Sequence, residues 1–428
     1  MKYLVAFILF FSMGVGSFVH AQGILFRQSH ENGVYHNGDR ARVVLSIKDK
    51  SAQVVTLKTQ HNFSSFTSDQ LSYSGDSLVV FDQIVSEPVT LVFEARTTND
   101  SGWIGLIVNP ELYQPGTKRP ADLESFWNKQ KKDLRALPVQ LISIPAANND
   151  PTYQCFDVEI NCTSPKPVRG YFAMPTNAAK SSLPIVINFH AAGVNGDWCK
   201  SKPEIALRYA RMGKGALVFD LNAHGMLNGQ SQAYYDSLDR GELNRYAQIG
   251  IANKNESYFL GMYQRLLRTI DYLTSLPEWD GKRILVIGES QGGGQSLVAA
   301  GLDKRVTAAV VTVPAMCDWG GSLVGRKGSW PYLFDNKLDK TVLEANLPYF
   351  DAVHLLKGST ATIVAEIGLI DQTCPSSALY AALNQTEGKN IILTAPYRAH
   401  HFTQTDYKKI WESQVNKVKQ SFVESYLK

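Results

Sequence analysis

The chain has 428 residues, of which 44% are apolar and 19% are charged, and its formal net charge is +4. This composition is typical of a globular protein with a sizeable core, and the length suits two domains. The small net charge and the absence of a basic stripe in the sequence argue against nucleic acid as a partner.

The first 21 residues have the pattern of a signal peptide. Met1 and Lys2 give a positive start, residues 5–11 are apolar, and Val19-His20-Ala21 resembles a cleavage site. The apolar run is too short and too interrupted by glycine for a stable membrane span, with an uncleaved anchor as the alternative. We expect export, to the periplasm or out of the cell, after cleavage near Ala21.

The five cysteines include no C-x-x-C pair, so a zinc site is not indicated; they are Cys155, Cys162, Cys199, Cys317 and Cys374. Cys155 and Cys162 lie along one predicted strand, too far apart for a disulfide. We expect most of the five to be buried thiols. The sequence predicts neither a metal nor an organic cofactor.

Residues 22–112 carry short β-strand patterns separated by turns. The predicted strands cover residues 42–47, 53–58, 78–81, 89–95 and 103–108. Short strands with regular turns predict a small all-β domain, an immunoglobulin-like sandwich. A sugar-binding module and a packing domain are both open as its role, and its few, scattered aromatic residues favour packing.

Residues 113–428 form the second predicted domain, reached through a proline-rich linker over 109–120. An amphipathic helix is predicted over 121–137, and strand and helix patterns alternate after it. The predicted strands are 153–160, 168–174, 184–189, 216–220, 284–287, 307–313, 361–367 and 390–394. Helices are predicted over 203–211, 257–276, 293–300 and 405–427. This alternation predicts an α/β fold whose mainly parallel sheet has helices on both faces.

The pentapeptide Gly288-Glu289-Ser290-Gln291-Gly292 follows one predicted strand and precedes a helix. In this context G-x-S-x-G indicates a nucleophile elbow, a tight turn that exposes one serine hydroxyl. Glycines on either side let strand and helix approach where a Cβ would clash. An ordinary surface turn is the alternative, and the flanking strand and helix favour the catalytic interpretation.

Ser290 needs a base and an orienting acid, in the chain order serine, acid, histidine. After Ser290 the sequence has three histidines: His354, in a predicted short helix, and the pair His400 and His401. The pair follows the last predicted strand, on a loop where active sites of such sheets gather, so one of the two is the predicted base. Asp371 follows the preceding strand and is the predicted acid.

The oxyanion hole is expected to combine the amide after the nucleophile with one from an earlier loop. The first is the Gln291 amide. The second lies in His190-Ala191-Ala192-Gly193, after the strand over 184–189, and Ala192 is the preferred donor, with Ala191 next. His190 precedes the serine and is interpreted as structural support. Trp319, Trp330 and Tyr332 either wall the acyl pocket or pack in the core.

From about residue 119 onward, the sequence resembles the acetyl xylan esterase and cephalosporin C deacetylase family of α/β-hydrolases. The resemblance rests on Ala121-Asp122-Leu123-Glu124-Ser125-Phe126-Trp127, Val286–Gly294, Val313–Asp318, Tyr349-Phe350-Asp351 and Gly368–Pro375. It implies the α/β-hydrolase fold, Ser290 as nucleophile, Asp371 as acid and His400 as base. It also implies an oxyanion hole formed by the Ala192 and Gln291 amides.

The sequence departs from this family at three places. Asn222-Ala223-His224 stands where the family has Arg-Gly-Gln, and His401 stands where a glutamate follows the catalytic histidine. The short family members lack the β-rich N-terminal domain, so the assembly of the family does not carry over directly. A homo-oligomer stays open for this chain.

The resulting prediction is an exported serine esterase that removes acetyl groups from carbohydrate through an acetyl-enzyme. Its partner is an acetylated oligosaccharide or another small acetyl ester. A peptidase of the prolyl oligopeptidase kind is one alternative, and a non-catalytic glycan-binding protein with a degenerate hydrolase domain is the other.

Overall fold

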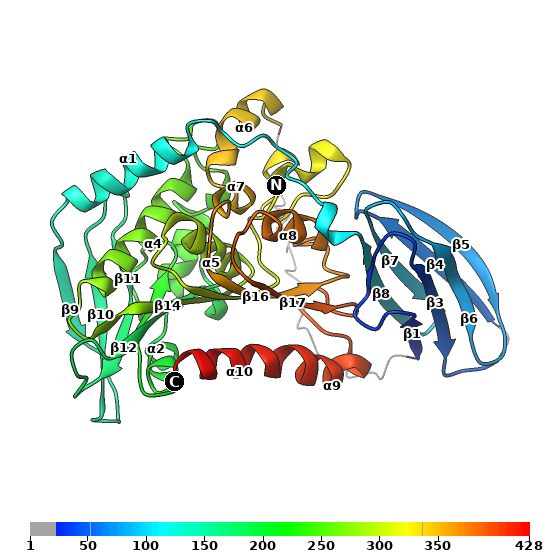
Figure 1. The fold of residues 1–428 in the computed structure, drawn as a ribbon, viewed down its shortest axis with the longest axis horizontal. Helices are drawn as coiled ribbons and strands as arrows, with labels where there is room; N and C mark the ends of the chain where they lie inside the picture. The colour runs from blue at the N-terminus through cyan, green and yellow to red at the C-terminus, as the bar shows by residue number, and fades with distance from the viewer. Residues whose placement is uncertain (1–22, 52, 336) are drawn as a thin grey trace, which may run out of the picture.

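The computed structural model describes residues 23–51, 53–335 and 337–428. The predicted signal peptide, residues 1–21, lies outside these residues. Figure 1 shows two small β-sheets at one end of the molecule, next to a large sheet layered with helices. Among the described residues, no helix has both the length and the apolar character that crossing a membrane requires.

The two small sheets pack face to face around one core. One contains β1 (Ile24–Gln28), β3 (Arg40–Ile47) and β6 (Leu78–Ile84), in the order β1-β3-β6. The other, in the order β2-β8-β7-β4-β5, contains β2 (Val34–Tyr35), β4 (Gln53–His61), β5 (Ser65–Tyr73), β7 (Val89–Arg96) and β8 (Ser101–Val108). Val43, Leu57 and Phe93 from the two sheets share this core.

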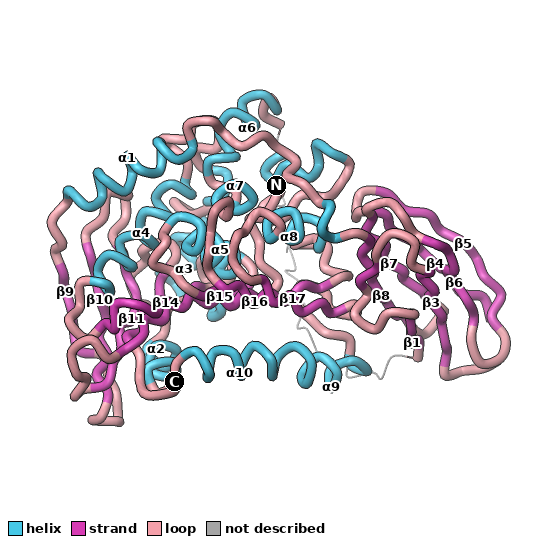
Figure 2. Tube along the Cα trace, in the orientation of Figure 1, coloured by secondary structure: helices cyan, strands magenta, loops and turns pink. Residues whose placement is uncertain are grey.

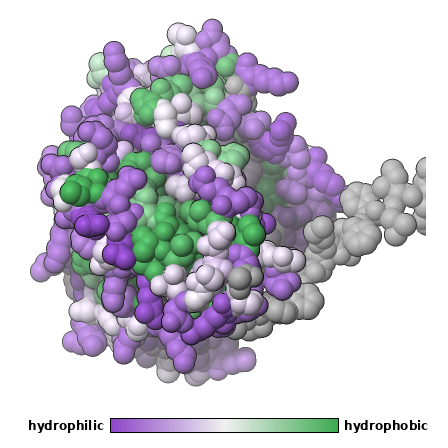
Figure 3. Space-filling view, turned by 90° about the vertical axis from the view of Figure 1, so that its right-hand side faces the viewer, coloured by the Kyte–Doolittle hydropathy of each residue, from purple (hydrophilic) through white to green (hydrophobic). Residues whose placement is uncertain are grey.

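The sequence predicted five of these strands and missed β1, β2 and β5. Strand β5 is largely exposed and polar and pairs only with β4, so it lacks the alternating apolar pattern of a half-buried strand. Figure 3 views the molecule from this end and shows patches of apolar side chains on the surface. The exposed large apolar residues of strands β4 to β6 are Val54, Phe66, Val79 and Ile84.

The large sheet has the strand order β17-β16-β15-β14-β12-β13-β11-β10-β9. Its strands are β9 (Leu141–Pro145), β10 (Tyr153–Ile160), β11 (Val168–Pro175), β12 (Leu183–Phe189), β13 (Leu217–Asn222), β14 (Trp279–Glu289), β15 (Ala308–Thr312), β16 (Thr362–Gly368) and β17 (Asn390–Ala395). Strands β12 to β17 run parallel, whereas β9, β10 and β11 pair antiparallel. The sheet is therefore mixed, and the strands predicted over 153–160 and 168–174 form the antiparallel pair β10 and β11.

Helices cover both faces of this sheet, as the alternating pattern predicted (Figure 2). One face packs against α1 (Leu123–Ala136), α4 (Tyr258–Thr274), α5 (Gln291–Leu302), α7 (Ala352–Leu355) and α8 (Ser376–Leu383). The other packs against α2 (Pro203–Ala210) and α10 (Lys417–Tyr426). The remaining α-helices are α3 (Gln232–Arg240), α6 (Lys340–Asn346) and α9 (Lys408–Trp411).

The alternation of side chains along β14 shows how one strand serves both layers. Ile284 and Val286 join the core beneath α4 and α5, whereas Leu285 joins the core beneath α2 and α10. The strand is buried on both faces because parallel strands in such layers are covered on each side. Ser290 follows directly after the end of this strand, whose central residues are covered by helices on both faces.

The small sheets dock on the end of the large sheet where β17 lies (Figure 1). The Gly105 amide of β8 donates to the Pro396 carbonyl at 2.8 Å, and the Thr394 hydroxyl donates to the Asn32 carbonyl at 2.8 Å. A Cβ at Gly105 would lie 2.3 Å from the Leu369 carbonyl oxygen, so only glycine permits this approach. The β-rich segment thus contacts the two loops that carry Asp371 and His400.

Candidate active site

Ser290 lies at a strained turn between β14 and α5. Its φ of 54° and ψ of −119° are rarely adopted by residues with a side chain, and such strain is concentrated at functional sites. A Cβ at Gly288 would lie 2.2 Å from the backbone of Gly292, and one at Gly292 would lie 2.3 Å from the Phe189 carbonyl oxygen. Both glycines of the motif are therefore required by close backbone contacts, as the sequence predicted.

The structure brings Ser290, His400 and Asp371 into one hydrogen-bonded chain. His400 Nδ1 lies 2.8 Å from Asp371 Oδ2, and His400 Nε2 lies 2.8 Å from Ser290 Oγ. A carboxylate accepts hydrogen bonds, so Nδ1 carries the proton and Nε2 accepts from the serine hydroxyl. All three residues are buried or nearly so.

Asp371 is held in place by the turn that follows β16. Its Oδ1 atom accepts from the amides of Thr373, at 2.8 Å, and Cys374, at 2.9 Å. This leaves Oδ2 free to orient His400, and because Asp371 is fully buried the carboxylate cannot turn to solvent. The helix cap that lone loop aspartates often form is absent here, since the two amides belong to the turn before α8 begins.

The other histidines considered from the sequence lie outside the hydrogen-bonded chain of Ser290, His400 and Asp371. His401 packs edge-on against His400, with ring centroids 4.7 Å apart, and lines the same cavity. His354 in α7 is buried beside Thr117, and burial lowers its pKa to about 4. His190 Nε2 lies 2.9 Å from Asp220 in the core, the supporting position that the sequence predicted.

The two predicted oxyanion donors belong to segments next to Ser290, since Gln291 follows it in the chain and Ala192 lines the same cavity. The Gln291 amide belongs to the first turn of α5, where amides have no acceptor within the helix. Ala191 and Ala192 line the cavity that contains Ser290. Trp198 Nε1 donates to the Ala192 carbonyl at 2.8 Å, which fixes the orientation of the backbone beside the serine.

His224 supports the same loop, a role that the sequence did not reveal. Its Nε2 lies 2.9 Å from the Gly193 carbonyl oxygen, which can only accept, so Nε2 carries the proton. Its Nδ1 then accepts from the Tyr258 hydroxyl at 2.7 Å. Burial lowers the pKa of His224 to about 3, so the ring stays neutral in this arrangement. The only sequence signal was its position in the segment that departs from the family pattern.

The cavity above Ser290 has a volume of about 470 Å³. It is lined by Ala191, Ala192, Trp198, Glu289, Ser290, Trp330, Thr373, His400 and His401. Of the three aromatic residues considered for its wall, only Trp330 lines it. Trp319 is buried behind it and donates to the Trp330 carbonyl, and the Tyr332 hydroxyl is directed to the Thr373 carbonyl. For these two residues, packing is the role that the contacts support.

The loop that carries His400 is tied to the small sheets. The Gln404 side chain accepts a hydrogen bond from the Trp103 amide at 3.0 Å and donates one to the Trp103 carbonyl at 2.8 Å. It thus pairs with the backbone of β8 in the way that the backbone of an adjacent strand does. The Tyr407 hydroxyl makes the same pair of contacts with the backbone of Phe26, at 3.0 and 2.8 Å. These four hydrogen bonds connect β1 and β8 to the segment around the histidine.

A buried ionic network supports this loop from beneath. Glu366 of β16 is fully buried and contacts Lys419 and Arg398, and Trp411 Nε1 donates to it at 2.8 Å. Burial alone would raise the pKa of Glu366, but Lys419 and the other partners outweigh it and the pKa is lowered. Arg398 lies two residues before His400, so the network fixes the start of the histidine turn.

One group of side chains in the described residues could bring three ligand atoms to a metal ion: Asp371, Cys374 and His400. Two of these already form the hydrogen bond described above. Burial raises the pKa of the Cys374 thiol well above its usual range, whereas metals bind the thiolate. The arrangement therefore fits a hydrogen-bonded histidine better than a metal centre. All five cysteines are free.

Two acidic residues in the segments that resemble the family prove to be structural. Asp351 accepts from the amides of Asp318, at 2.8 Å, and Trp319, at 2.6 Å. Asp318 in turn accepts from the Gly116 amide at 2.6 Å and pairs with Arg326. These contacts tie the linker after β8 to the segment behind Trp330.

Replacing Glu366 tests the network beneath the loop. Glu366→Gln leaves Lys419 and Arg398 buried without their anion, and we expect the free energy of unfolding to fall by about 3 kcal/mol at neutral pH. The lowered pKa means that this stabilisation is present above the ordinary glutamate value of about 4.3 and is lost as the pH falls below it. Urea unfolding across this range measures both effects.

The exposed Glu412 serves as the control for this experiment. We expect Glu412→Gln to change the stability by no more than about 0.5 kcal/mol. Equal losses in the two variants, or a loss in Glu366→Gln that does not shrink in acid, would contradict the role assigned to Glu366.

Comparison with known proteins places most of the chain in one family. Residues 109–414 match the family described as Acetyl xylan esterase (AXE1), so the two small sheets lie outside the family match. An acetyl esterase, Axe7A, from Xylanibacter ruminicola is 28% identical over 392 residues, covering 89% of this chain and 87% of that protein.

Two solved structures have a similar fold. They are an acetyl xylan esterase from Paenibacillus sp. R4, 23% identical, and acetyl xylan esterase 1 from Thermoanaerobacterium sp. JW/SL YS485, 21% identical. Each matches with a TM-score of 0.60 and covers 74% of this chain and 98% of its own. The chain belongs to the acetyl xylan esterase family and is a carboxylic ester hydrolase with the α/β-hydrolase fold and a large mixed sheet.

Proposed function

We propose that the protein removes acetyl groups from carbohydrate, with Ser290 as nucleophile, His400 as base and Asp371 as the orienting acid. The observation that carries this proposal is the hydrogen-bonded chain of these three residues inside a cavity of about 470 Å³. The serine oxygen attacks the acetyl carbonyl carbon while His400 Nε2 takes its proton. Asp371 stabilises the imidazolium that forms.

The tetrahedral oxyanion is stabilised by the amides of Gln291 and Ala192. His400 then gives its proton to the sugar oxygen, the carbon–oxygen bond breaks, and the deacetylated sugar leaves. A water molecule, deprotonated by His400, attacks the acetyl-enzyme. Acetate departs and the proton returns to Ser290. Each step moves a proton only between Ser290, His400 and the reacting oxygen, so the cycle uses no cofactor.

Several features of the cavity favour a small acyl group on a sugar. The small side chains of Ala191 and Ala192 border Ser290, which suits the short acetyl group. The Trp198 side chain is 65% exposed beside the cavity although its Nε1 is hydrogen bonded. An exposed aromatic face with a fixed orientation is suited to contact with the apolar face of a sugar ring.

The alternatives have less support. A prolyl oligopeptidase would carry a propeller, and the described strands form sheets of three, five and nine strands without repeated blades. A degenerate, glycan-binding hydrolase would not need Ser290 in a strained conformation with His400 2.8 Å from its hydroxyl.

We infer that residues 22–112 form an immunoglobulin-like domain, with the hydrolase domain over 113–428. Supporting this, three antiparallel strands face a five-stranded sheet, and the short strand β2 pairs parallel to the last strand, β8. Its contacts with the His400 loop favour a packing role over sugar binding. Export and any homo-oligomer stay predictions from the sequence.

The proposed function is tested by acetate release from acetylated xylo-oligosaccharides. We expect the wild-type protein to release acetate and Ser290→Ala to lose about 10⁴-fold or more in kcat. Equal activity of the two proteins would refute the nucleophile. Faster cleavage of a proline amide than of acetyl esters would favour the peptidase instead.

Replacing His224 tests the support of the oxyanion loop. His224→Leu removes the donor to the Gly193 carbonyl, and we expect kcat on p-nitrophenyl acetate to fall roughly ten- to a hundredfold because the Ala192 amide is displaced. Tyr258→Phe, which keeps the donor to Gly193, should lose much less. If both variants kept wild-type kcat while folded, His224 would have no part in positioning the loop.

A further inference from the structure

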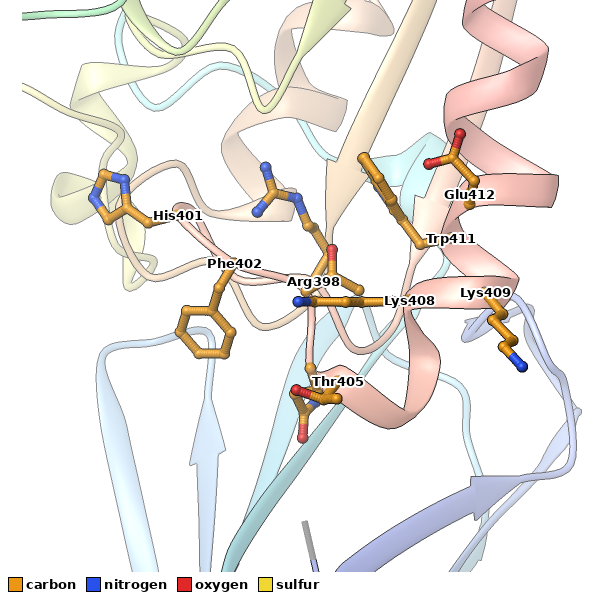
Figure 4. A pocket seen from close by; sticks show the side chains of 10 residues that line it. Arg398, His401, Phe402, Thr405, Lys408, Lys409, Trp411 and Glu412 are labelled. Atoms are coloured by element: carbon orange, nitrogen blue, oxygen red, sulfur yellow. The ribbon is translucent and has the colours of Figure 1, made fainter. Parts of the chain in front are cut away.

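A second cavity lies directly beside the catalytic one. It has a volume of about 870 Å³ and is formed by the loop after β17 and by α9 (Figure 4). His401 lines both cavities, so its side chain forms the border between them. We call this second cavity the basic groove; it is lined by Arg398, His401, Phe402, Thr403, Gln404, Thr405, Lys408, Lys409, Trp411 and Glu412. The mechanism above makes no use of it.

The groove has an excess of positive charge. Three of its lining residues are lysine or arginine, against the single carboxylate of Glu412. Arg398 forms an ion pair with Glu366 and lies 3.7 Å from Glu289, so its charge already has partners within the protein. Within the described part of the chain, Lys408 and Lys409 have no ion-pair partner.

The two lysines differ in direction. In Figure 4, Lys408 extends into the groove toward Phe402, whereas Lys409 points away from the other labelled side chains. Lys408 can therefore meet a ligand in the groove, and Lys409 provides a matched control with the same charge one residue away.

The groove also offers an apolar surface close to the reacting atoms. Phe402 is 50% exposed and follows His401 directly in the chain. An exposed aromatic ring beside polar side chains suits a sugar ring, which has one apolar face and many hydroxyl groups. The groove thus combines a sugar-sized surface with an unpaired cation, on the far side of His401 from Ser290.

We propose that the basic groove binds the carboxylate of a uronic acid residue joined to the acetylated sugar, with Lys408 as its ionic partner. This inference rests on the proposed function, because the uronic acid belongs to the sugar that leaves when the acetyl group is transferred to Ser290. The acetyl group enters the cavity of Ser290, and the oligosaccharide passes His401 into the groove. The preferred substrates are therefore acidic acetylated oligosaccharides.

The test compares two acetylated xylo-oligosaccharides of equal length, one neutral and one with a single glucuronic acid branch. Acetate release gives kcat/KM for the wild type, Lys408→Gln and Lys409→Gln, in low and high salt. We expect the wild type to prefer the acidic substrate by up to about fivefold in low salt, the size of an exposed ion pair. High salt should reduce this preference.

Lys408→Gln should lose the preference while keeping wild-type kcat/KM on the neutral oligosaccharide and on p-nitrophenyl acetate. Lys409→Gln should keep the preference. No preference in the wild type, or equal losses in the two lysine variants, would overturn the proposal while leaving the deacetylase function intact. If the wild type releases no more acetate from either oligosaccharide than Ser290→Ala does, the proposed function fails and this inference fails with it.

Discussion

The hydrogen bond between His400 and Asp371 is the interaction on which the site depends. It fixes Nδ1 as the ring nitrogen that carries the proton, so that Nε2 accepts the hydrogen bond from the serine hydroxyl. Its two partners come from different loops, one after β16 and one after β17. The fold must therefore keep these two neighbouring loops at a fixed distance and orientation, so that the hydrogen bond between Asp371 and His400 can form.

Much of the surrounding structure helps to hold these two loops in place. Backbone amides hold Asp371 from within its own turn, and the buried Glu366 with its cations anchors the residues before His400. The small sheets contribute from outside through Gln404 and Tyr407. Through these contacts the N-terminal strands pack against the loop that carries His400, and Gly105 lies against the backbone of Leu369, where a side chain would not fit.

The sequence predicted the parts of this arrangement that depend on local order. Ser290 was predicted because a glycine-flanked serine stands between a strand and a helix. Asp371 was predicted because it follows β16, the second strand after β14. The residues could not decide between His400 and His401, because neighbours in a loop differ only in the direction of the side chain. The family resemblance favoured His400, and the geometry places its ring, rather than that of His401, between the other two residues.

Contacts between segments that are far apart in the chain could not be predicted from the sequence. Trp103 and Gln404 are 301 positions apart, and neither segment has a sequence pattern that predicts their hydrogen bonds. His224 was noticed only as a departure from a pattern, since its role depends on a carbonyl in another loop. The polar strand β5 was missed because it is exposed at a sheet edge, where burial does not impose alternation.

The most direct test of this account compares His400→Ala with His401→Ala, using kcat/KM on p-nitrophenyl acetate and thermal unfolding to show that both variants are folded. The geometry predicts that His400→Ala loses about 10⁴-fold or more, because Ser290 then lacks its base. His401→Ala, which alters only the border between the two cavities, should lose less than about tenfold on this small ester. A folded His401→Ala variant without activity, beside an active His400→Ala variant, would contradict the account.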